Sequence, residues 1–516
     1  MEIHVRRSPG HAHRRQLLLR KGFSYFASIV ISLTCLLLWW RLFILSPPQQ
    51  AWPFAPDENR ANQQSSSISS ESFPRSPVIA YVISFIKCGD HQSTVAGMMD
   101  AIAVLRHSVH LHSIRHRHHH HSRTTTTTTK LSSSPLSSRY DYQFYALVHQ
   151  QAVHDCQADQ LLSQLGITVL VRDTPVRLDE IQSDTLRNKV PRAWCCGHAE
   201  FIKLYAYTLT QHPLVVHMDV DFLLTRPMDV VFDAMLFSPD SPRGRAARHA
   251  VPLEFPREAK QSWLSSTIPT AMMTRDWGQV SPGRKPGYQA GFLVIRPDIQ
   301  VFEALRHTIR TADYVDGFSR RNGWGGKGYG SFVGAEAMQG LLAYYYDVIA
   351  PPGSWIELNA CRFNHMGMDM LYRANPNFLR KHKKVGKCRN DRDYCEDCQT
   401  TPVSEIYSIH YTQCRKPWAC VAESKWVRGS TGIPEDNVLL PHCLELATVW
   451  HSYRHDLETQ VRSLMDETSV ANIKKHHNGT YFPHVFQGHC RDYGSENYIP
   501  LTVNPNVIRL IPKLYQ

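Results

Sequence analysis

Two carboxylates separated by one residue, Asp219 and Asp221, follow an apolar stretch that begins at Pro213. The stretch predicts a buried strand, and alternation along an extended backbone points residues i and i+2 the same way. Both acids therefore face one site beyond the carboxyl end of the strand, where open α/β sheets bind ligands. Two hard oxygen ligands at one place suit Mn²⁺ or Mg²⁺. The alternative is a pair of ordinary acids in a strand-end turn, because Asp-x-Asp also occurs by chance.

Two later segments carry residues that would complete such a site. Residues 287–297 predict a buried strand in which Gly291, lacking a side chain, lets a ligand approach the backbone. Residues 406–418 predict a strand that reaches His410, with Lys416 six residues further on. A neutral imidazole can complete a metal shell, and an ammonium can neutralise a phosphate. Each residue alone also fits a structural role, but together with the two acids they indicate a nucleoside-diphosphate site.

Strands and helices alternate around these residues. We expect strands at 78–85, 142–149 and 167–171, and helices at 93–106 and 198–210. This alternation predicts an α/β fold with a mostly parallel central sheet flanked by helices.

Two stretches lie outside the alternation. Residues 110–138 include the histidine run 118–121 and six consecutive threonines, so they predict a disordered insertion at about 107–139, or alternatively a metal-binding histidine tract. A C-terminal extension at 436–516 follows the main domain, which we place at 78–435. Apolar positions spaced along 444–461 predict a long helix in this extension, packed on the main domain.

The first 77 residues predict a membrane anchor and a stem. Residues 22–45 form an apolar run long enough for one transmembrane helix, and the basic tail 1–21 indicates a cytosolic N-terminus. The Ser-, Pro- and Gln-rich stretch 46–77 predicts a flexible stem. A cleaved signal peptide is the alternative, but its apolar core spans only about 7–15 residues. We therefore expect a single-pass type II protein of the Golgi or ER membrane with a luminal body.

Charge and cysteine content agree with this placement. The formal net charge of +12 is concentrated in the first 21 positions and in low-complexity segments rather than on one face, which argues against nucleic-acid binding. Of 13 cysteines only Cys35 lies in the anchor, so twelve can form disulfides in an oxidising lumen. The pair Cys395 and Cys398 offers half of a zinc site, but no second Cys-x-x-Cys accompanies it. Asn478 begins the only N-glycosylation sequon.

In order and spacing, these motifs resemble those of glycosyltransferase family 8, the retaining, metal-dependent group that includes glycogenin and the galactinol synthases. The resemblance covers roughly residues 78 to 420. It rests on Asp219-Val-Asp221, Gln289-Ala-Gly291, Gln339-Gly-Leu-Leu342 and His410 followed by Lys416-Pro-Trp418. It implies a GT-A-like nucleotide-diphospho-sugar transferase that moves a hexose from a UDP-sugar to a hydroxyl acceptor on a glycan or glycoprotein.

The same resemblance implies a role for each matching residue. Asp219, Asp221 and His410 would bind Mn²⁺, with Asp219 also contacting the nucleotide sugar. Lys416 would hold the diphosphate and Lys203 would contact the donor from its helix. The Gln289–Gly291 turn would lie in the donor site.

Gln339 would steady the cationic sugar. Glu336, three residues earlier, shares its face if the segment is helical, and is either a second catalytic group or a solvated helix-start acid. Residues 237–288 predict a long insertion beside the site, with four arginines in its first half, and are either an acceptor-binding lid or a mobile loop. These arginines are Arg243, Arg245, Arg248 and Arg257.

Two departures from the family keep other functions open. Many relatives have Asn or Asp where Gln289 stands, and an acid where Met338 stands. An inactive nucleotide-sugar-binding protein of the same fold therefore remains an alternative. A haloacid-dehalogenase-like phosphatase also places Asp-x-Asp after a buried strand, but it requires Thr or Val where this chain has Leu223.

Overall fold

The computed structural model describes residues 76–88, 92–113, 138–193, 196–254, 268–317, 319–372, 386–421, 439–465 and 487–516. By its internal contacts the chain divides into Met1–Ser67 and Ile68–Gln516, and all described residues belong to the second unit. The predicted anchor, nearly all of the stem, the histidine run and the sequon at Asn478 lie outside the described residues. No helix within the described ranges is long and apolar enough to cross a membrane.

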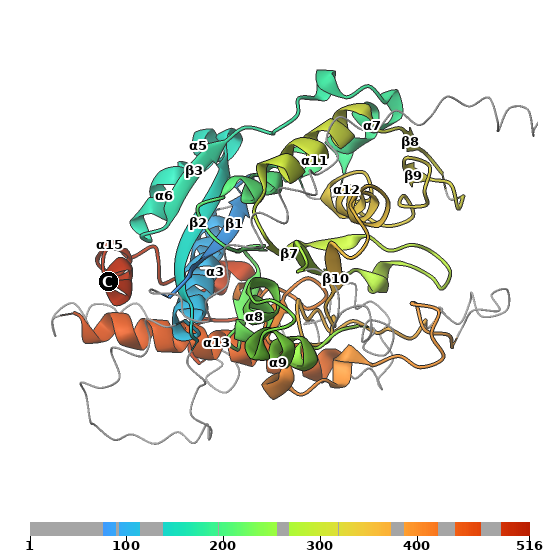
Figure 1. Ribbon diagram of the computed structural model, residues 1–516. Helices are drawn as coiled ribbons and strands as arrows, with labels where there is room; N and C mark the ends of the chain where they lie inside the picture. The colour runs from blue at the N-terminus through green and yellow to red at the C-terminus, as the bar shows by residue number, and fades with distance from the viewer. Residues whose placement is uncertain are drawn as a thin grey trace, which may run out of the picture. The chain divides into compact units, whose positions relative to one another are not determined.

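A seven-stranded sheet in the order β10-β6-β7-β4-β1-β2-β3 forms the centre of the described region (Figure 1). Strand β7 runs antiparallel to both of its neighbours, whereas the other neighbouring pairs are parallel. The strands are β1 Val78–Phe85, β2 Asp141–His149, β3 Thr168–Arg172, β4 Val215–Met218, β6 Ala271–Arg275, β7 Tyr288–Ile295 and β10 Trp355–Glu357. The predicted mostly parallel α/β sheet is confirmed.

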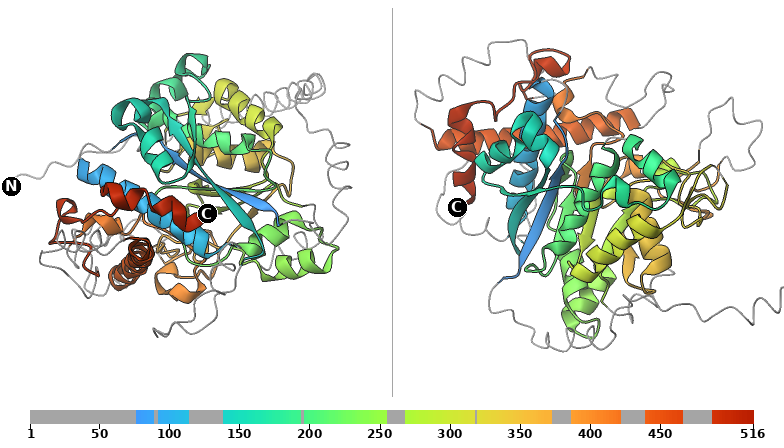
Figure 2. Two further views of the ribbon diagram at one scale, coloured as in Figure 1. Left: turned by 90° about the vertical axis from the view of Figure 1, so that its left-hand side faces the viewer. Right: turned by 90° about the horizontal axis from the view of Figure 1, so that it is seen from above.

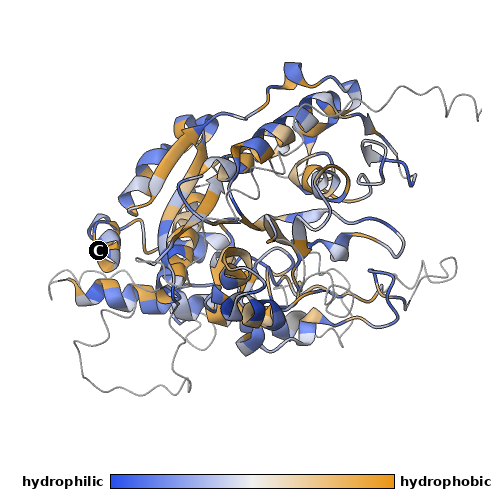
Figure 3. Ribbon diagram, in the orientation of Figure 1, coloured by the Kyte–Doolittle hydropathy of each residue, from blue (hydrophilic) through white to orange (hydrophobic). Residues whose placement is uncertain are grey.

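Helical segments cover both faces of this sheet (Figure 2). Along β1, Ile79 and Tyr81 point into one core and Ala80 and Val82 into the other, as the alternation of a strand requires. The first core contains α3 (Gln92–Leu111), α8 (Asp229–Leu236) and α13 (Leu439–Ser463), and the second contains η4 (Gly197–Thr208), α11 (Ile299–Thr311) and α12 (Met338–Tyr344). Figure 3 shows mostly apolar residues along the central strands and mixed faces on the helices around them.

Shorter elements complete the described region. The helices are α5 Gln150–Cys156, α6 Ala158–Gln164, α7 Asp184–Lys189, α9 Pro242–Ala250 and α15 Pro505–Ile508. Two small antiparallel strand pairs accompany them. In the first, β5 Phe222–Leu224 pairs with β11 Ser408–His410, and in the second, β8 Tyr314–Val315 pairs with β9 Gly323–Trp324.

Three predicted boundaries differ from the structure. The apolar stretch predicted as one strand forms β4 and β5, because the chain turns at Asp219–Asp221 and β5 leaves the central sheet to pair with β11. The segment 198–210 is a run of 3₁₀ turns rather than an α-helix. Residues 237–288 are not a loop throughout, because they include α9 and contribute β6 to the sheet between β10 and β7. Arg257 lies outside the described residues.

Helix α3 continues past Arg106, into the predicted disordered insertion. His107 Nε2 lies 2.8 Å from Asp456 Oδ2, and His110 Nδ1 lies 3.1 Å from the Tyr142 hydroxyl. These histidines have partners from distant parts of the chain, so tertiary contacts extend the helix to Leu111.

The predicted C-terminal helix is α13, and it packs against α3 (Figure 1). Asp100 of α3 is completely buried and lies 3.1 Å from Arg454 Nε of α13. The same carboxylate accepts hydrogen bonds from the Tyr498 hydroxyl and from the main-chain amides of Leu501 and Thr502, at 2.7, 2.7 and 2.8 Å. One buried acid therefore anchors both α13 and the segment that follows it.

Five disulfides lie within the described residues. They join Cys88 to Cys156, Cys361 to Cys398, Cys388 to Cys395, Cys414 to Cys443 and Cys420 to Cys490. Cys395 and Cys398 bond to different partners, so the disulfide interpretation is confirmed and the zinc interpretation is wrong. The last two bonds tie the segment after β11 to the C-terminal extension.

Candidate functional site

Asp219, Asp221 and His410 meet beyond the carboxyl end of β4. One ligand atom from each lies within 4.8 Å of the others. His410 Nε2 is 3.4 Å from Asp221 Oδ1 and 3.9 Å from Asp219 Oδ2. Two backbone pairings bring them together, because His410 stands opposite Phe222 in the β5–β11 pair and the Asp219 amide donates to Gly291 O at 3.0 Å.

This position is a switch point of the sheet. The chain passes from β1 to β2 and β3 on one side, and then crosses to β4 on the other side of β1. Connections therefore leave the carboxyl ends of β1 and β4 in opposite directions, which opens a crevice where α/β sheets bind ligands. The acidic turn occupies the β4 side of that crevice.

The orientation of His410 follows from its neighbours. Asn364 Nδ2 donates to the Thr274 hydroxyl at 2.7 Å, so Asn364 Oδ1 is left to accept from His410 Nδ1, which is 2.9 Å away. With its proton on Nδ1, the imidazole presents a bare Nε2 toward the two carboxylates. Asn364 has a φ of 53°, a left-handed conformation that asparagine tolerates better than most residues.

A buried lysine balances the first carboxylate. Lys203 Nζ lies 2.9 Å from Asp219 Oδ1 and 3.1 Å from Glu200 Oε1, and its side chain is only 5% exposed. Burial opposes the charge of Asp219, but Lys203 outweighs it and lowers the pKa of Asp219 to about 2. Burial, reinforced by Lys203, lowers the pKa of His217 to about 3, so this β4 residue is neutral beside the site.

Lys416 turns toward the acids rather than away from them. Its Nζ donates to Asp221 Oδ2 and to the carbonyl oxygen of Tyr411. The predicted diphosphate ligand therefore lies against a predicted metal ligand, and the two proposed roles are coupled through Asp221.

One face of β7 forms the floor of the site. A Cβ atom added at Gly291 would lie 2.6 Å from His410 Cε1 and 2.8 Å from Asp219 Oδ2, and one added at Gly287 would lie 3.0 Å from Gln339 Cβ. Gln289 stands between them on the same face, and its Oε1 accepts from the Gly291 amide at 2.7 Å. At 3.3–3.4 Å per residue the two glycines are about 13 Å apart.

Gln339 is fixed by a carboxylate that the sequence analysis missed. Asp276 follows β6, is 3% exposed, and hydrogen-bonds to the side chains of Gln279 and Gln339. Burial raises the pKa of Asp276, against the opposing effect of these amides and of His410. Gln339 Oε1 is buried and has no hydrogen-bond partner within the described ranges.

Glu336 does not share a helical face with Gln339. Helix α12 begins at Met338, so Glu336 lies in the preceding turn, and the expected i, i+3 relation does not apply. Its charge acts instead on Tyr314. Burial raises the pKa of Tyr314, and the negative charge of Glu336 raises it further.

Three residues that sequence reasoning did not identify now belong to the site: Asn364, Asp276 and His217. His217 carried a local signal, since it lies two residues before Asp219 on the same side of the strand. Asp276 was hidden in a segment interpreted as an insertion. Asn364 had no local signal, because only its contact with His410 gives it a role.

The sequence matches no protein-family model and no curated relative. Among solved structures, the chain is similar to mouse xyloside xylosyltransferase 1 in its apo form, at 11% identity over 65% of this chain and 98% of that one, with a TM-score of 0.32. It is similar to the glycosyltransferase GlyE of Streptococcus pneumoniae TIGR4, at 10% identity over 75% of this chain and 64% of that one, with a TM-score of 0.32. It is also similar to the galactosyltransferase LgtC in complex with donor and acceptor sugar analogs, at 12% identity over 69% of this chain and 98% of that one, with a TM-score of 0.28. These superpositions are loose, so the geometry of the site carries the functional argument.

Proposed function

We propose that the chain is a metal-dependent glycosyltransferase of GT-A-like fold, which transfers a hexose from a UDP-sugar to a hydroxyl group of a glycan or glycoprotein. The observation that carries the proposal is the convergence of Asp219, Asp221 and His410 at the switch point of the sheet. Lys203 and Lys416 beside them supply the positive charge that a diphosphate requires.

The three ligand residues fit Mn²⁺. Two carboxylates offer hard oxygen atoms, and Asn364 leaves the Nε2 atom of His410 without a proton, as metal coordination requires. When bound, the ion would neutralise the negative charge that develops on the leaving diphosphate. Lys203 keeps Asp219 ionised, and Lys416 can turn from Asp221 to the diphosphate.

The sugar would lie along β7 toward Gln339. Gln289 and the carbonyl oxygen of Gln339, which has no partner among the described residues, offer polar groups on this side, and Asp276 holds the Gln339 amide in place. In the proposed mechanism Gln339 steadies the cationic sugar while the acceptor oxygen attacks from the face of the leaving group, which retains configuration. Glu336 remains a proposed second group, and Glu336→Gln tests it by turnover.

The test uses the purified full-length chain in detergent with a panel of UDP-sugars and glycan acceptors. We expect release of UDP that requires Mn²⁺ and is abolished by a chelator. If no UDP-sugar binds more tightly when Mn²⁺ is added, the proposal fails.

Met338 favours the inactive nucleotide-sugar-binding protein as the second candidate, because position 338 itself supplies no carboxylate. That function predicts Mn²⁺-dependent UDP-sugar binding without release of UDP in the presence of any acceptor. The same assay separates the two.

We further propose that the body is luminal and held by a single N-terminal anchor. The five disulfides support an oxidising compartment. Protease added to intact microsomes should spare the body, whereas digestion in sealed vesicles would exclude this orientation.

A further inference from the structure

A hollow of about 310 Å³ is lined mainly by cationic and neutral polar side chains. The lining residues are Gln279, Val280, Ser281, Arg284, Ser331, Tyr372 and Arg389. None of them is acidic, whereas two are arginines and three carry hydroxyl groups. A ligand that fills this pocket therefore meets hydrogen-bond donors and positive charge.

Arg284 has a buried donor with no partner among the described residues. Its Nη1 atom is buried and makes no hydrogen bond to any residue that the structure describes. An unsatisfied buried donor costs free energy, and more so when it is charged. Because Arg284 lines the pocket, an oxyanion there can satisfy this donor once the guanidinium turns toward it.

Arg389 is held rigidly but not neutralised by its hydrogen bonds. Its Nε donates to Asp369 O at 2.9 Å and its Nη1 to Val280 O at 2.8 Å, both main-chain carbonyl oxygens. Its guanidinium lies 5.2 Å from the centre of the Tyr372 ring. Burial lowers the pKa of Arg389 and outweighs the opposite effect of the nearby acids Asp369 and Asp276.

The pocket adjoins the sugar side of the proposed active site. Gln279 Nε2 donates to Asp276 Oδ2 at 2.6 Å, and Asp276 also bonds to Gln339. Both His410 and Arg389 affect the pKa of Asp276, so this buried acid lies within electrostatic reach of the metal ligands and of the pocket.

We propose that this pocket binds the oxyanion of an acidic acceptor, a carboxylate or a phosphate or sulfate ester carried by a sugar. The inference rests on the proposed function, because an acceptor must approach the donor sugar from beside Gln339. Planar guanidinium groups match such oxyanions with paired hydrogen bonds.

The stretch of chain between two residues of the pocket is also rich in positive charge. Between Tyr372 and Arg389 the chain contains several basic residues and no acid: Arg373, Arg380, Lys381, Lys383, Lys384 and Lys387. Such a run attracts anions from solution. Most of it lies outside the described residues.

The test measures binding of four probes to the full-length chain by calorimetry in the presence of Mn²⁺ and UDP. The probes are methyl glucuronide, glucose 6-phosphate, glucose 6-sulfate and methyl glucoside as the neutral match. We expect at least one anionic sugar to bind at least about ten times more tightly than the neutral one. Comparison of the three anions identifies which oxyanion the site prefers.

Arg284→Gln should weaken the preferred anionic sugar by about tenfold or more, since a hydrogen bond to a charged group is lost. Arg284→Lys should keep part of the affinity, and Arg509→Gln, an exposed arginine of the C-terminal segment, should keep all of it. Thermal unfolding of each variant verifies folding.

Equal binding of charged and neutral sugars would overturn the inference. So would unchanged anion binding in Arg284→Gln, or inorganic phosphate binding as tightly as the sugar. Mn²⁺-dependent binding of UDP to the wild-type chain, measured in the same buffer, tests the proposed function separately. Failure of that binding overturns the proposed function, and with it the acceptor role of the pocket.

Discussion

At the scale of single residues, each proposed metal ligand is controlled by a partner from elsewhere in the chain. Lys203 holds Asp219, Lys416 contacts Asp221, and Asn364 orients His410. A substitution in a partner should therefore alter metal binding without removing a ligand.

Asp221→Asn keeps the shape of the side chain but removes the charge that attracts Mn²⁺. We expect turnover to fall by at least about a hundredfold, the scale for loss of an electrostatic stabiliser, with little change in thermal stability. Steady-state UDP release with varied Mn²⁺ measures the effect. Asp179→Asn, in an exposed pair with Arg177, is the control. Full activity of Asp221→Asn would remove the metal assignment.

Asn364→Ala should weaken Mn²⁺ binding by about 10–100-fold, as loss of a group that orients a ligand usually does. The reason is that His410 Nδ1 loses its acceptor and the imidazole can then change tautomer or rotate. Asn364→Asp keeps an acceptor and tolerates the left-handed backbone, so it should retain most of the affinity. Equal Mn²⁺ affinity of the Ala and Asp variants in calorimetry would contradict this role.

Lys416→Met should change two affinities in opposite directions. Without nucleotide, Mn²⁺ should bind more tightly, because no ammonium competes for Asp221. With Mn²⁺ present, UDP should bind about tenfold more weakly, since a hydrogen bond from a charged group is lost. Mn²⁺ titrations with and without UDP measure both. Normal UDP binding would mean that Lys416 does not hold the diphosphate.

At the scale of elements, α13 holds the segment that carries Lys416. His451 Nε2 donates to Pro417 O at 3.3 Å, and Trp418 packs against Trp450 with ring centres 5.8 Å apart. The disulfide from Cys414 to Cys443 joins the same two segments. The C-terminal extension is therefore part of the support of the site rather than an appendage.

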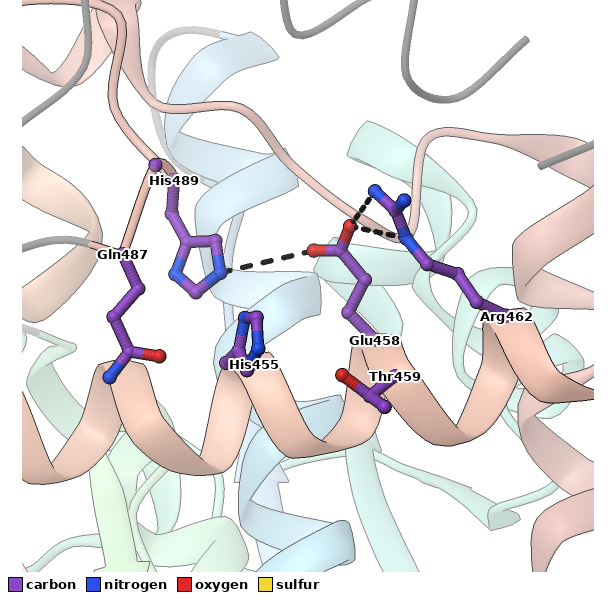
Figure 4. Close-up of a pocket in the computed structure, with 7 residues that line it drawn as sticks. His455, Glu458, Thr459, Arg462, Gln487 and His489 are labelled. Atoms are coloured by element: carbon purple, nitrogen blue, oxygen red, sulfur yellow. Dashed lines mark hydrogen bonds and ion pairs between the residues drawn. The ribbon is translucent and has the colours of Figure 1, made fainter. Parts of the chain in front are cut away.

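A charged cluster lies on the same helix beside a pocket of about 380 Å³ (Figure 4). Glu458 Oε2 is 2.7 Å from Arg454 Nη1, and Glu458 Oε1 is 2.9 Å from Arg462 Nε. Burial opposes ionisation, but the two arginines outweigh it and lower the pKa of Glu458 to about 2.

This depressed pKa predicts a dependence of stability on pH. The contribution of Glu458 is complete above its unfolded pKa of 4.5 and is lost as pH falls toward 2. Between pH 6 and pH 3 the wild type should lose about 2 kcal/mol of unfolding free energy that Glu458→Gln does not lose. Urea unfolding at both pH values measures this, with Glu445→Gln on the same helix as control. Parallel losses in wild type and Glu458→Gln would refute it.

At the scale of the whole molecule, the disulfides differ most in the length of chain that they close. Cys420 and Cys490 are 70 residues apart, whereas Cys388 and Cys395 are 7 apart. Removing the long link should cost about 2 kcal/mol more than removing the short one, because closure entropy grows with the logarithm of loop length. Urea unfolding of the two double Cys→Ser variants tests this. Equal costs would show that native-state contacts, not chain entropy, set the effect.

The sequence by itself determined the α/β class and pointed to the residues of the candidate metal site. Continuous apolar runs such as Val78–Phe85 have few alternatives to a buried strand, and alternation within a strand is a local property. The Asp-x-Asp pair and the spacing of His410 and Lys416 are likewise visible along the chain. The long C-terminal helix was predictable from the spacing of its own apolar residues.

Only the tertiary structure decided how these parts meet. The turn at Asp219–Asp221 exists because β5 pairs with β11, almost two hundred residues away, and no local pattern encodes that partner. The same holds for β6, which became a strand only between β7 and β10, and for Asn364, which matters only through His410. Pairing and burial between distant segments depend on the whole fold. They therefore cannot be predicted from the residues that neighbour each segment in the sequence.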